Sequence, residues 1–181
     1  RVFEKVHTAV QASFDEATGV KRRLIDWALS VGRRVSELEQ EQKPVPTGLA
    51  LQHRLADKLV YSKVKAKLGG RLRLPISGGA PLAKEIAEFF HTIDIAIMEG
   101  YGQTECTTAS NVNMPNHFRF GTVGPAIPGI EVKIADDGEI LVRGPNVFAG
   151  YYKDGQASRE VLDDDGWLHT GDIGDIEDGF L

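Results

Sequence analysis

Apolar residues in the first part of the chain recur at helical spacing. This spacing predicts helix over residues 1–40 and again over residues 51–68, where Gly69 and Gly70 end the pattern. The apolar positions of the first helix are Val2, Val6, Val10, Leu24, Ile25, Ala28 and Leu29. We therefore expect residues 1–70 to form a mainly helical region.

The period changes to two after residue 70. Leu72, Leu74 and Ile76 alternate with polar residues or proline, which predicts a strand, and Ile93–Ile97 predicts another. Between them lies a tight turn, Ser77–Pro81, and an apolar helical face, with Pro81 suited to the first helical position. This order of strand, turn, helix and strand predicts an α/β unit with parallel strands over residues 71–115.

The last third of the chain has the pattern of a β structure. Residues 130–134 and 140–142 alternate on either side of Asp136-Asp137-Gly138, which is a strong hairpin signal. A short helix is predicted over 157–162, and short strands are predicted at 167–168 and 173–176. We expect residues 116–181 to form a small β subdomain.

Composition and charge limit the classes of protein that remain. The chain has 181 residues and one cysteine, Cys106, so an internal disulfide is impossible and a reducing, cytoplasmic compartment is expected. No apolar run approaches the length of a membrane span. The chain starts without Met and stops inside what reads as continuing sequence, so we expect a piece of a longer protein.

The net charge of −5 is unevenly distributed. Residues 1–73 hold 15 Lys and Arg against 8 Asp and Glu, whereas residues 74–181 hold 6 against 18. Solvated helix faces explain the basic part, and attraction to an anionic membrane surface stays open as an alternative. Aromatic residues are few there, so a base-stacking platform for nucleic acid is not expected.

Two small-residue turns follow predicted strands, Ser77–Pro81 and Gly100–Glu105. In an open α/β sheet, ligands bind beyond the carboxyl ends of the strands, so each turn is a candidate wall of one site. Within the second turn, the ring of Tyr101 can stack on a purine, the hydroxyl of Thr104 can bind a phosphate oxygen, and Glu105 suits Mg²⁺. A core tyrosine, a capping threonine and a surface glutamate are the structural alternative. Walker and dinucleotide glycine motifs are absent from the sequence.

The segment Tyr101-Gly102-Gln103-Thr104-Glu105 resembles the YGxTE motif of the superfamily of AMP-forming acyl-CoA synthetases, adenylation domains and luciferases. Other stretches match motifs of this superfamily in the expected order: Ser77–Leu82, Gly121–Gly129, Gly138–Tyr152 and Trp167–Asp172. The first residues, Arg1–Val6, and the long helical region resemble long-chain fatty acyl-CoA synthetases.

This resemblance implies a role for each matching position. Tyr101 would stack on adenine, Thr104 would hold the α-phosphate, Glu105 would ligate Mg²⁺ and Asp172 would accept hydrogen bonds from both ribose hydroxyls. The remaining residues expected to line the ATP or AMP site are Gly79, Ala80, Pro81, Glu99, Gly100 and Gly102. The superfamily often has Gln at the position of Glu99, where a backbone contact to adenine would survive the change of side chain.

The implied fold is part of the large N-terminal α/β domain of an adenylate-forming enzyme. The implied reaction converts a long-chain fatty acid, ATP and CoA into acyl-CoA through an acyl-adenylate, with Mg²⁺ as cofactor. The phosphate loop and the catalytic Lys of the superfamily do not occur in these 181 residues, so we expect the chain to be inactive alone. The alternatives are an acyl-AMP ligase or another adenylate-forming enzyme that does not use CoA, and a non-catalytic nucleotide-binding scaffold.

Overall fold

The computed structural model describes residues 2–181. Arg1, the first residue of the segment that resembles long-chain synthetases, lies outside the described residues. The chain divides into two compact units, each described by itself. The helical unit comprises Arg1–Pro75 and Leu82–Ile97, and the strand unit comprises Ile76–Pro81 and Met98–Leu181. In the described part of the chain, no helix combines the length and the apolar character that a membrane span requires.

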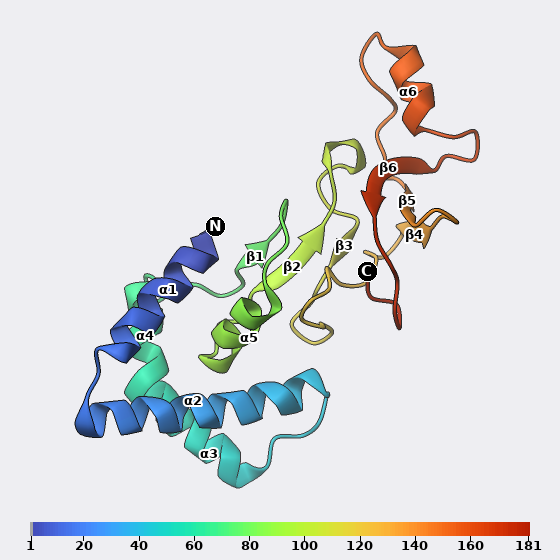
Figure 1. Ribbon diagram of the computed structural model, residues 1–181. Coiled ribbons are helices and arrows are strands. Elements are labelled where there is room, and N and C mark those ends of the chain that lie inside the picture. The colour runs from blue at the N-terminus through green and yellow to red at the C-terminus, as the bar shows by residue number, and fades with distance from the viewer. Residues whose placement is uncertain (1) are drawn as a thin grey trace. The chain divides into compact units, whose positions relative to one another are not determined.

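The helices of the helical unit are coloured blue to green in Figure 1. The helices are α1 (Val2–Asp15), α2 (Gly19–Gln40), α3 (Thr47–Ala56), the π-helical turn η1 (Asp57–Tyr61), α4 (Ser62–Lys67) and α5 (Lys84–Thr92). The helix predicted over residues 1–40 is thus interrupted between α1 and α2, and Gly19, the first residue of α2, has a left-handed φ of 59°.

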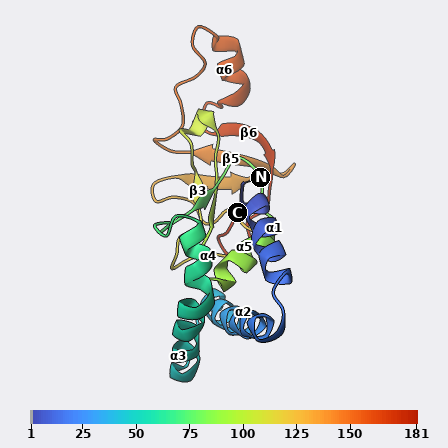
Figure 2. The same cartoon turned by 90° about the vertical axis from the view of Figure 1, so that its left-hand side faces the viewer.

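Helix α2 contacts both α3 and α5, and Figure 2 shows α1, α2 and α5 from a second side. The backbone of α2 approaches the end of α5 closely at Gly32, where an added Cβ would lie 2.0 Å from the carbonyl oxygen of Thr92. Near this contact, the buried hydroxyl of Tyr61 donates a hydrogen bond to the carbonyl oxygen of Ala28 over 2.5 Å. A small residue and one aromatic hydroxyl therefore set the packing of α2 in the helical unit.

Within the described residues, the strand unit has two three-stranded sheets. Strand β2 (Met98–Tyr101) pairs in parallel with β1 (Ile76–Ser77) and antiparallel with β3 (Asn111–Val112). Strands β4 (Glu131–Ile134), β5 (Glu139–Arg143) and β6 (Leu168–Ile173) form an antiparallel sheet. The remaining elements are the 3₁₀ turn η2 (Thr104–Cys106) and α6 (Gly155–Val161). The predicted hairpin is confirmed, and a parallel pair is present as predicted, although between Ile76–Ser77 and Met98–Glu99.

The core of the strand unit joins the segment after β2 to the second sheet. Cys106, Ile140, Val142 and Leu168 form one buried cluster. Cys106 is fully buried and has no disulfide partner, as predicted for a structural cysteine.

Two strand predictions were wrong in their placement. The strand expected at Ile93–Ile97 is observed at Met98–Tyr101, and the strand expected from Leu72 is limited to Ile76–Ser77. Ile95 and Ile97 are buried on either side of a half-buried residue, but their backbone has no ladder partner. The alternation of apolar residues over Ile93–Ile97 therefore indicated an extended backbone. Whether an extended segment pairs as a strand depends on whether another backbone segment lies next to it. Helix α5 begins at Lys84, so Pro81 is not its first residue.

Candidate functional site

The two turns singled out in the sequence lie next to each other in the strand unit. β1 and β2 are parallel neighbours with Ser77 opposite Glu99, so the chain leaves both strands at the same edge of the sheet. The turn after β1 continues through Gly79, which has a φ of 76°, to Ala80 and Pro81. A Cβ at Gly78 would lie 3.3 Å from the carbonyl oxygen of Gly100, so the two backbones are in close contact. This edge is where a ligand of an open α/β sheet binds.

The turn after β2 is held in one shape by close backbone contacts. A Cβ at Gly102 would lie 2.1 Å from the carbonyl oxygen of Thr108 and 2.7 Å from Cα of Ala109. Thr107 and Thr108 both have left-handed φ values, 49° and 83°, which non-glycine residues rarely adopt. Asn146 fixes the turn from the loop after β5, because its Nδ2 donates to the carbonyl oxygen of Cys106 over 3.0 Å. Such over-determined strain is typical of ligand-binding turns.

Two candidate residues that are 71 positions apart in the sequence meet in a hydrogen bond. The hydroxyl of Tyr101 donates to Oδ2 of Asp172 over 2.7 Å. Burial, and secondly this bond to Asp172, raises the pKa of the Tyr101 hydroxyl, so it stays a protonated donor at neutral pH. Gln103 makes a second link between the two segments, because its Nε2 donates to the carbonyl oxygen of Thr170 over 3.4 Å.

Glu105 has a partner that sequence reasoning missed. Oε1 of Glu105 accepts a hydrogen bond from the hydroxyl of Tyr151 over 2.8 Å, and this bond is the main cause that raises the pKa of Tyr151. The backbone carbonyl of Glu105 also accepts from the amide of Phe148 over 2.8 Å. Tyr151 lies in a stretch that resembles a superfamily motif, so the motif match was the available signal for its importance.

The donors around Glu105 fit Mg²⁺. Glu105 and Thr104 lie on η2 and offer a carboxylate and a hydroxyl, both hard oxygen donors, and both side chains reach the surface. Mg²⁺ is commonly bound through one or two carboxylates together with substrate phosphates and water rather than by a closed protein cage. In residues 2–181 no group of three or more His, Cys, Asp or Glu side chains could hold a metal by itself.

Glu99 and Gly100 lie where β2 meets the two turns. Glu99 is only 6% exposed, and its carbonyl oxygen accepts from the amide of Asn113 over 2.8 Å. Gly100 pairs with Val112 across the β2–β3 ladder, and a Cβ at Gly100 would lie 3.2 Å from the carbonyl oxygen of Asn111. The backbone at this position is therefore packed on the β3 side.

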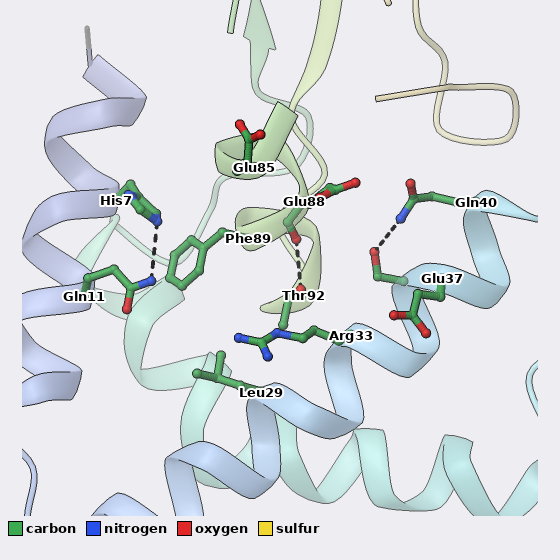
Figure 3. A pocket seen from close by; sticks show the side chains of 11 residues that line it. His7, Gln11, Leu29, Arg33, Glu37, Gln40, Glu85, Glu88, Phe89 and Thr92 are labelled. Atoms are coloured by element: carbon green, nitrogen blue, oxygen red, sulfur yellow. Dashed lines mark hydrogen bonds between the residues drawn. The ribbon is translucent and has the colours of Figure 1, made fainter. Parts of the chain in front are cut away.

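A separate pocket of about 350 Å³ lies in the helical unit, between α1, α2 and α5 (Figure 3). Arg33, His7, Glu37, Glu85 and Glu88 are among the residues that line it. None of the predicted site residues lines this pocket. Its mixed charges select no single class of ligand, so the candidate site is the one in the strand unit.

A family model described as AMP-binding enzyme matches residues 28–152. That range includes the turns after β1 and β2, while Asp172 lies beyond it. Among curated proteins, the long-chain-fatty-acid–CoA ligase FadD15 of Mycobacterium tuberculosis (strain ATCC 25618 / H37Rv) is 41% identical over 184 residues, which cover 100% of this chain and 30% of that protein. Human long-chain-fatty-acid–CoA ligase 1 is 38% identical over 190 residues, covering 96% of this chain and 26% of that protein.

Solved structures of MatB are similar in fold to this chain. Apo MatB from Rhodopseudomonas palustris superimposes with a TM-score of 0.59 at 30% identity, covering 82% of this chain and 32% of that one. ATP-bound MatB from the same organism gives a TM-score of 0.58 at 33% identity, covering 68% and 28%. The chain spans between about a quarter and a third of the length of these curated relatives. The expected α/β fold, as found in the N-terminal part of adenylate-forming enzymes, is confirmed.

Proposed function

Because the chain belongs to the family of AMP-binding enzymes, we propose that it supplies the adenine-, ribose- and Mg²⁺-binding part of a long-chain fatty acid–CoA ligase. Such a ligase converts a fatty acid, ATP and CoA into acyl-CoA, AMP and pyrophosphate. The observation that carries the proposal is the 2.7 Å hydrogen bond between Tyr101 and Asp172, because it joins an aromatic ring and a carboxylate at one edge of the β1–β2 pair.

The adenosine part of ATP fits this pair of side chains. The ring of Tyr101 offers a stacking face for adenine, while Gly79, Ala80 and Pro81 offer the opposite turn with little side-chain bulk. One oxygen of Asp172 accepts from Tyr101, which leaves the other oxygen and further lone pairs for ribose hydroxyls. Gly102 lets the backbone of the turn pack closely enough to keep Tyr101 in place.

Thr104 and Glu105 would bind the phosphate end of the nucleotide. The hydroxyl of Thr104 would donate to an α-phosphate oxygen, and the second carboxylate oxygen of Glu105 would bind Mg²⁺ while Tyr151 orients the carboxylate. When bound, Mg²⁺ supplies positive charge that offsets the charge of the phosphates. The contribution of this chain to catalysis is therefore to position the nucleotide and to stabilise its charge.

The reaction proceeds in two displacements. A carboxylate oxygen of the fatty acid attacks the α-phosphorus of ATP, and the bond to pyrophosphate breaks to give an acyl-adenylate. The thiolate of CoA then attacks the acyl carbonyl carbon, and AMP leaves with the electrons of the acyl–oxygen bond. We propose the long-chain class of fatty acid because two relatives that match along nearly the whole chain, FadD15 and human ligase 1, are named long-chain-fatty-acid–CoA ligases.

We propose a cytoplasmic location, with contact of the helical unit to an anionic membrane surface as the alternative to solvated helix faces. The support is the excess of Lys and Arg in residues 1–73, which would attract anionic lipids. Binding of the full-length protein to vesicles with and without phosphatidylglycerol, measured at rising salt, tests this proposal. Vesicle binding that is unchanged by phosphatidylglycerol and by salt would contradict the proposal.

A pyrophosphate-exchange assay on the full-length protein tests the activity. Radiolabelled pyrophosphate should enter ATP only when a fatty acid is present, and exchange should be strongest for long chains. AMP release should then rise when CoA is added. Exchange without any response to CoA would favour an acyl-AMP ligase, and absence of both exchange and ATP binding would favour the non-catalytic scaffold.

A further inference from the structure

Strand β6 carries an irregularity at the segment that holds Asp172. Glu139 of β5 pairs with Ile173, and Leu141 pairs with His169. Between these two pairs β5 contains one residue, Ile140, whereas β6 contains three, Thr170–Asp172. The extra residues must leave the ladder, so this segment of β6 is bulged. Bulges beside binding sites commonly re-aim a side chain.

A bulge leaves backbone groups without ladder partners, and here side chains replace those partners. Oε1 of Glu139 accepts a hydrogen bond from the amide of Gly171 over 2.8 Å. The hydroxyl of Thr170 donates to the carbonyl oxygen of Ile140 over 2.7 Å and accepts from the amide of Asp172 over 3.2 Å. Gly171 has a φ of 73°, which is the left-handed conformation that the bulge requires.

The Glu139 carboxylate has a second attachment. Its Oε2 lies 2.7 Å from Nδ1 of His169, the residue immediately before the bulged segment. The side chain of Glu139 is 18% exposed, so solvent competes little for these bonds. Glu139 itself is fixed at the start of β5, because its amide donates to Oδ1 of Asp137 over 3.1 Å. One carboxylate thus holds both ends of the turn that precedes Asp172.

We propose that Glu139 is a positioning residue for the nucleotide: its carboxylate holds Thr170–Asp172 in the shape that presents the Asp172 carboxylate to the ribose hydroxyls. This inference rests on the proposed function, because it assumes that Asp172 binds ribose. The Glu139 carboxylate bonds to His169 and to the amide of Gly171, neither of which is a predicted nucleotide-binding residue, so its effect on the nucleotide passes through the backbone of the bulged segment.

The test compares two nucleotides in the full-length protein. Calorimetric titration measures the Kd of ATP and of 2′,3′-dideoxy-ATP, which lacks the two hydroxyls, for the wild type and for Glu139→Gln. The amide keeps the size of the side chain but removes the charge that strengthens both hydrogen bonds. We expect Glu139→Gln to weaken ATP binding about tenfold and to change dideoxy-ATP binding by less than about twofold, since one charge-assisted bond is worth about that much.

Two further variants sharpen the comparison. Adding Glu139→Gln to Asp172→Asn should cause little further loss of ATP affinity, because residues that act through one another are not additive. Glu131→Gln is the matched control, because Glu131 lies in the same sheet and pairs with Arg143 over 2.7 Å, away from the bulge. The Glu131→Gln protein should prefer ATP over dideoxy-ATP as strongly as the wild type does. Glu139→Asp, which keeps the charge, replaces the glutamine variant if that protein does not fold, and it should show a smaller loss that is again specific to ATP.

The outcomes separate this inference from the proposed function. If the wild type binds ATP and dideoxy-ATP equally, the ribose role of Asp172 fails and this inference fails with it. If the wild type prefers ATP but Glu139→Gln keeps that preference, or loses affinity for both nucleotides equally, only the positioning role of Glu139 is overturned.

Discussion

Replacing Gly102 with Ala tests whether the turn after β2 is as tightly packed as its geometry indicates. The added Cβ would lie 2.1 Å from the carbonyl oxygen of Thr108 and 2.7 Å from Cα of Ala109, whereas ordinary contacts of a Cβ fall at 3.4–4 Å. Both neighbours are backbone atoms, so no side-chain rotation can relieve the overlap. The turn would have to shift by about 1 Å, and overpacking of this kind typically costs about 1–3 kcal/mol.

Urea unfolding, followed by fluorescence, measures this cost. We expect Gly102→Ala to lower the free energy of unfolding by about 2–3 kcal/mol with an unchanged slope against urea concentration. Gly48→Ala is the matched control: Gly48 lies in α3, has no positive φ, and a Cβ added to it would meet no heavy atom within 4 Å. This control should be neutral or should stabilise by up to about 1 kcal/mol. A Gly102→Ala protein within about 0.5 kcal/mol of the wild type would refute the packing argument.

Three further predictions concern burial, hydrogen bonding and metal. Burial lowers the pKa of His91 to about 4, although Glu39 Oε2 lies 3.5 Å from its Nε2. Because an unfolded histidine binds a proton near pH 6.5, the free energy of unfolding should fall by up to about 3 kcal/mol between about pH 6.5 and pH 4. His91→Gln should make the free energy of unfolding, measured with urea, less dependent on pH in this range. A pH profile that is the same for both proteins would contradict this. Tyr61→Phe should cost about 1–2 kcal/mol in the same assay, because the buried bond to the carbonyl of Ala28 is lost; an unchanged midpoint would show that the bond contributes nothing. Glu105→Gln in the full-length protein should raise the Mg²⁺ concentration needed for half-maximal pyrophosphate exchange by about tenfold or more, since a charged ligand becomes neutral; an unchanged Mg²⁺ titration would remove Glu105 as a ligand.

Much of the local structure could be predicted because local patterns encode it. The alternation around Asp136-Asp137-Gly138 correctly predicted the β4–β5 hairpin, since turn residues and period-two burial act over a few neighbouring positions. The small apolar character of Cys106 correctly predicted a buried, unpaired thiol. The helical periodicity of the first forty residues was also correct, although the interruption before Gly19 was not expected.

Strand placement shows where local patterns stop being informative. Ile95 and Ile97 alternate in burial as a strand does, yet the ladder with β1 begins at Met98. Which residues pair is decided by the backbone that lies alongside, and that backbone comes from another part of the chain. The local sequence pattern does not show which segment this partner is.

The sequence by itself determined the family resemblance and the residue types of the candidate site. Only the tertiary structure brought Tyr101 to Asp172, Glu105 to Tyr151 and Glu139 to the bulged segment of β6. These pairs lie between 32 and 71 positions apart. Their meeting depends on sheet register, on turns with left-handed φ and on close backbone packing, and these arise only when the whole unit folds together.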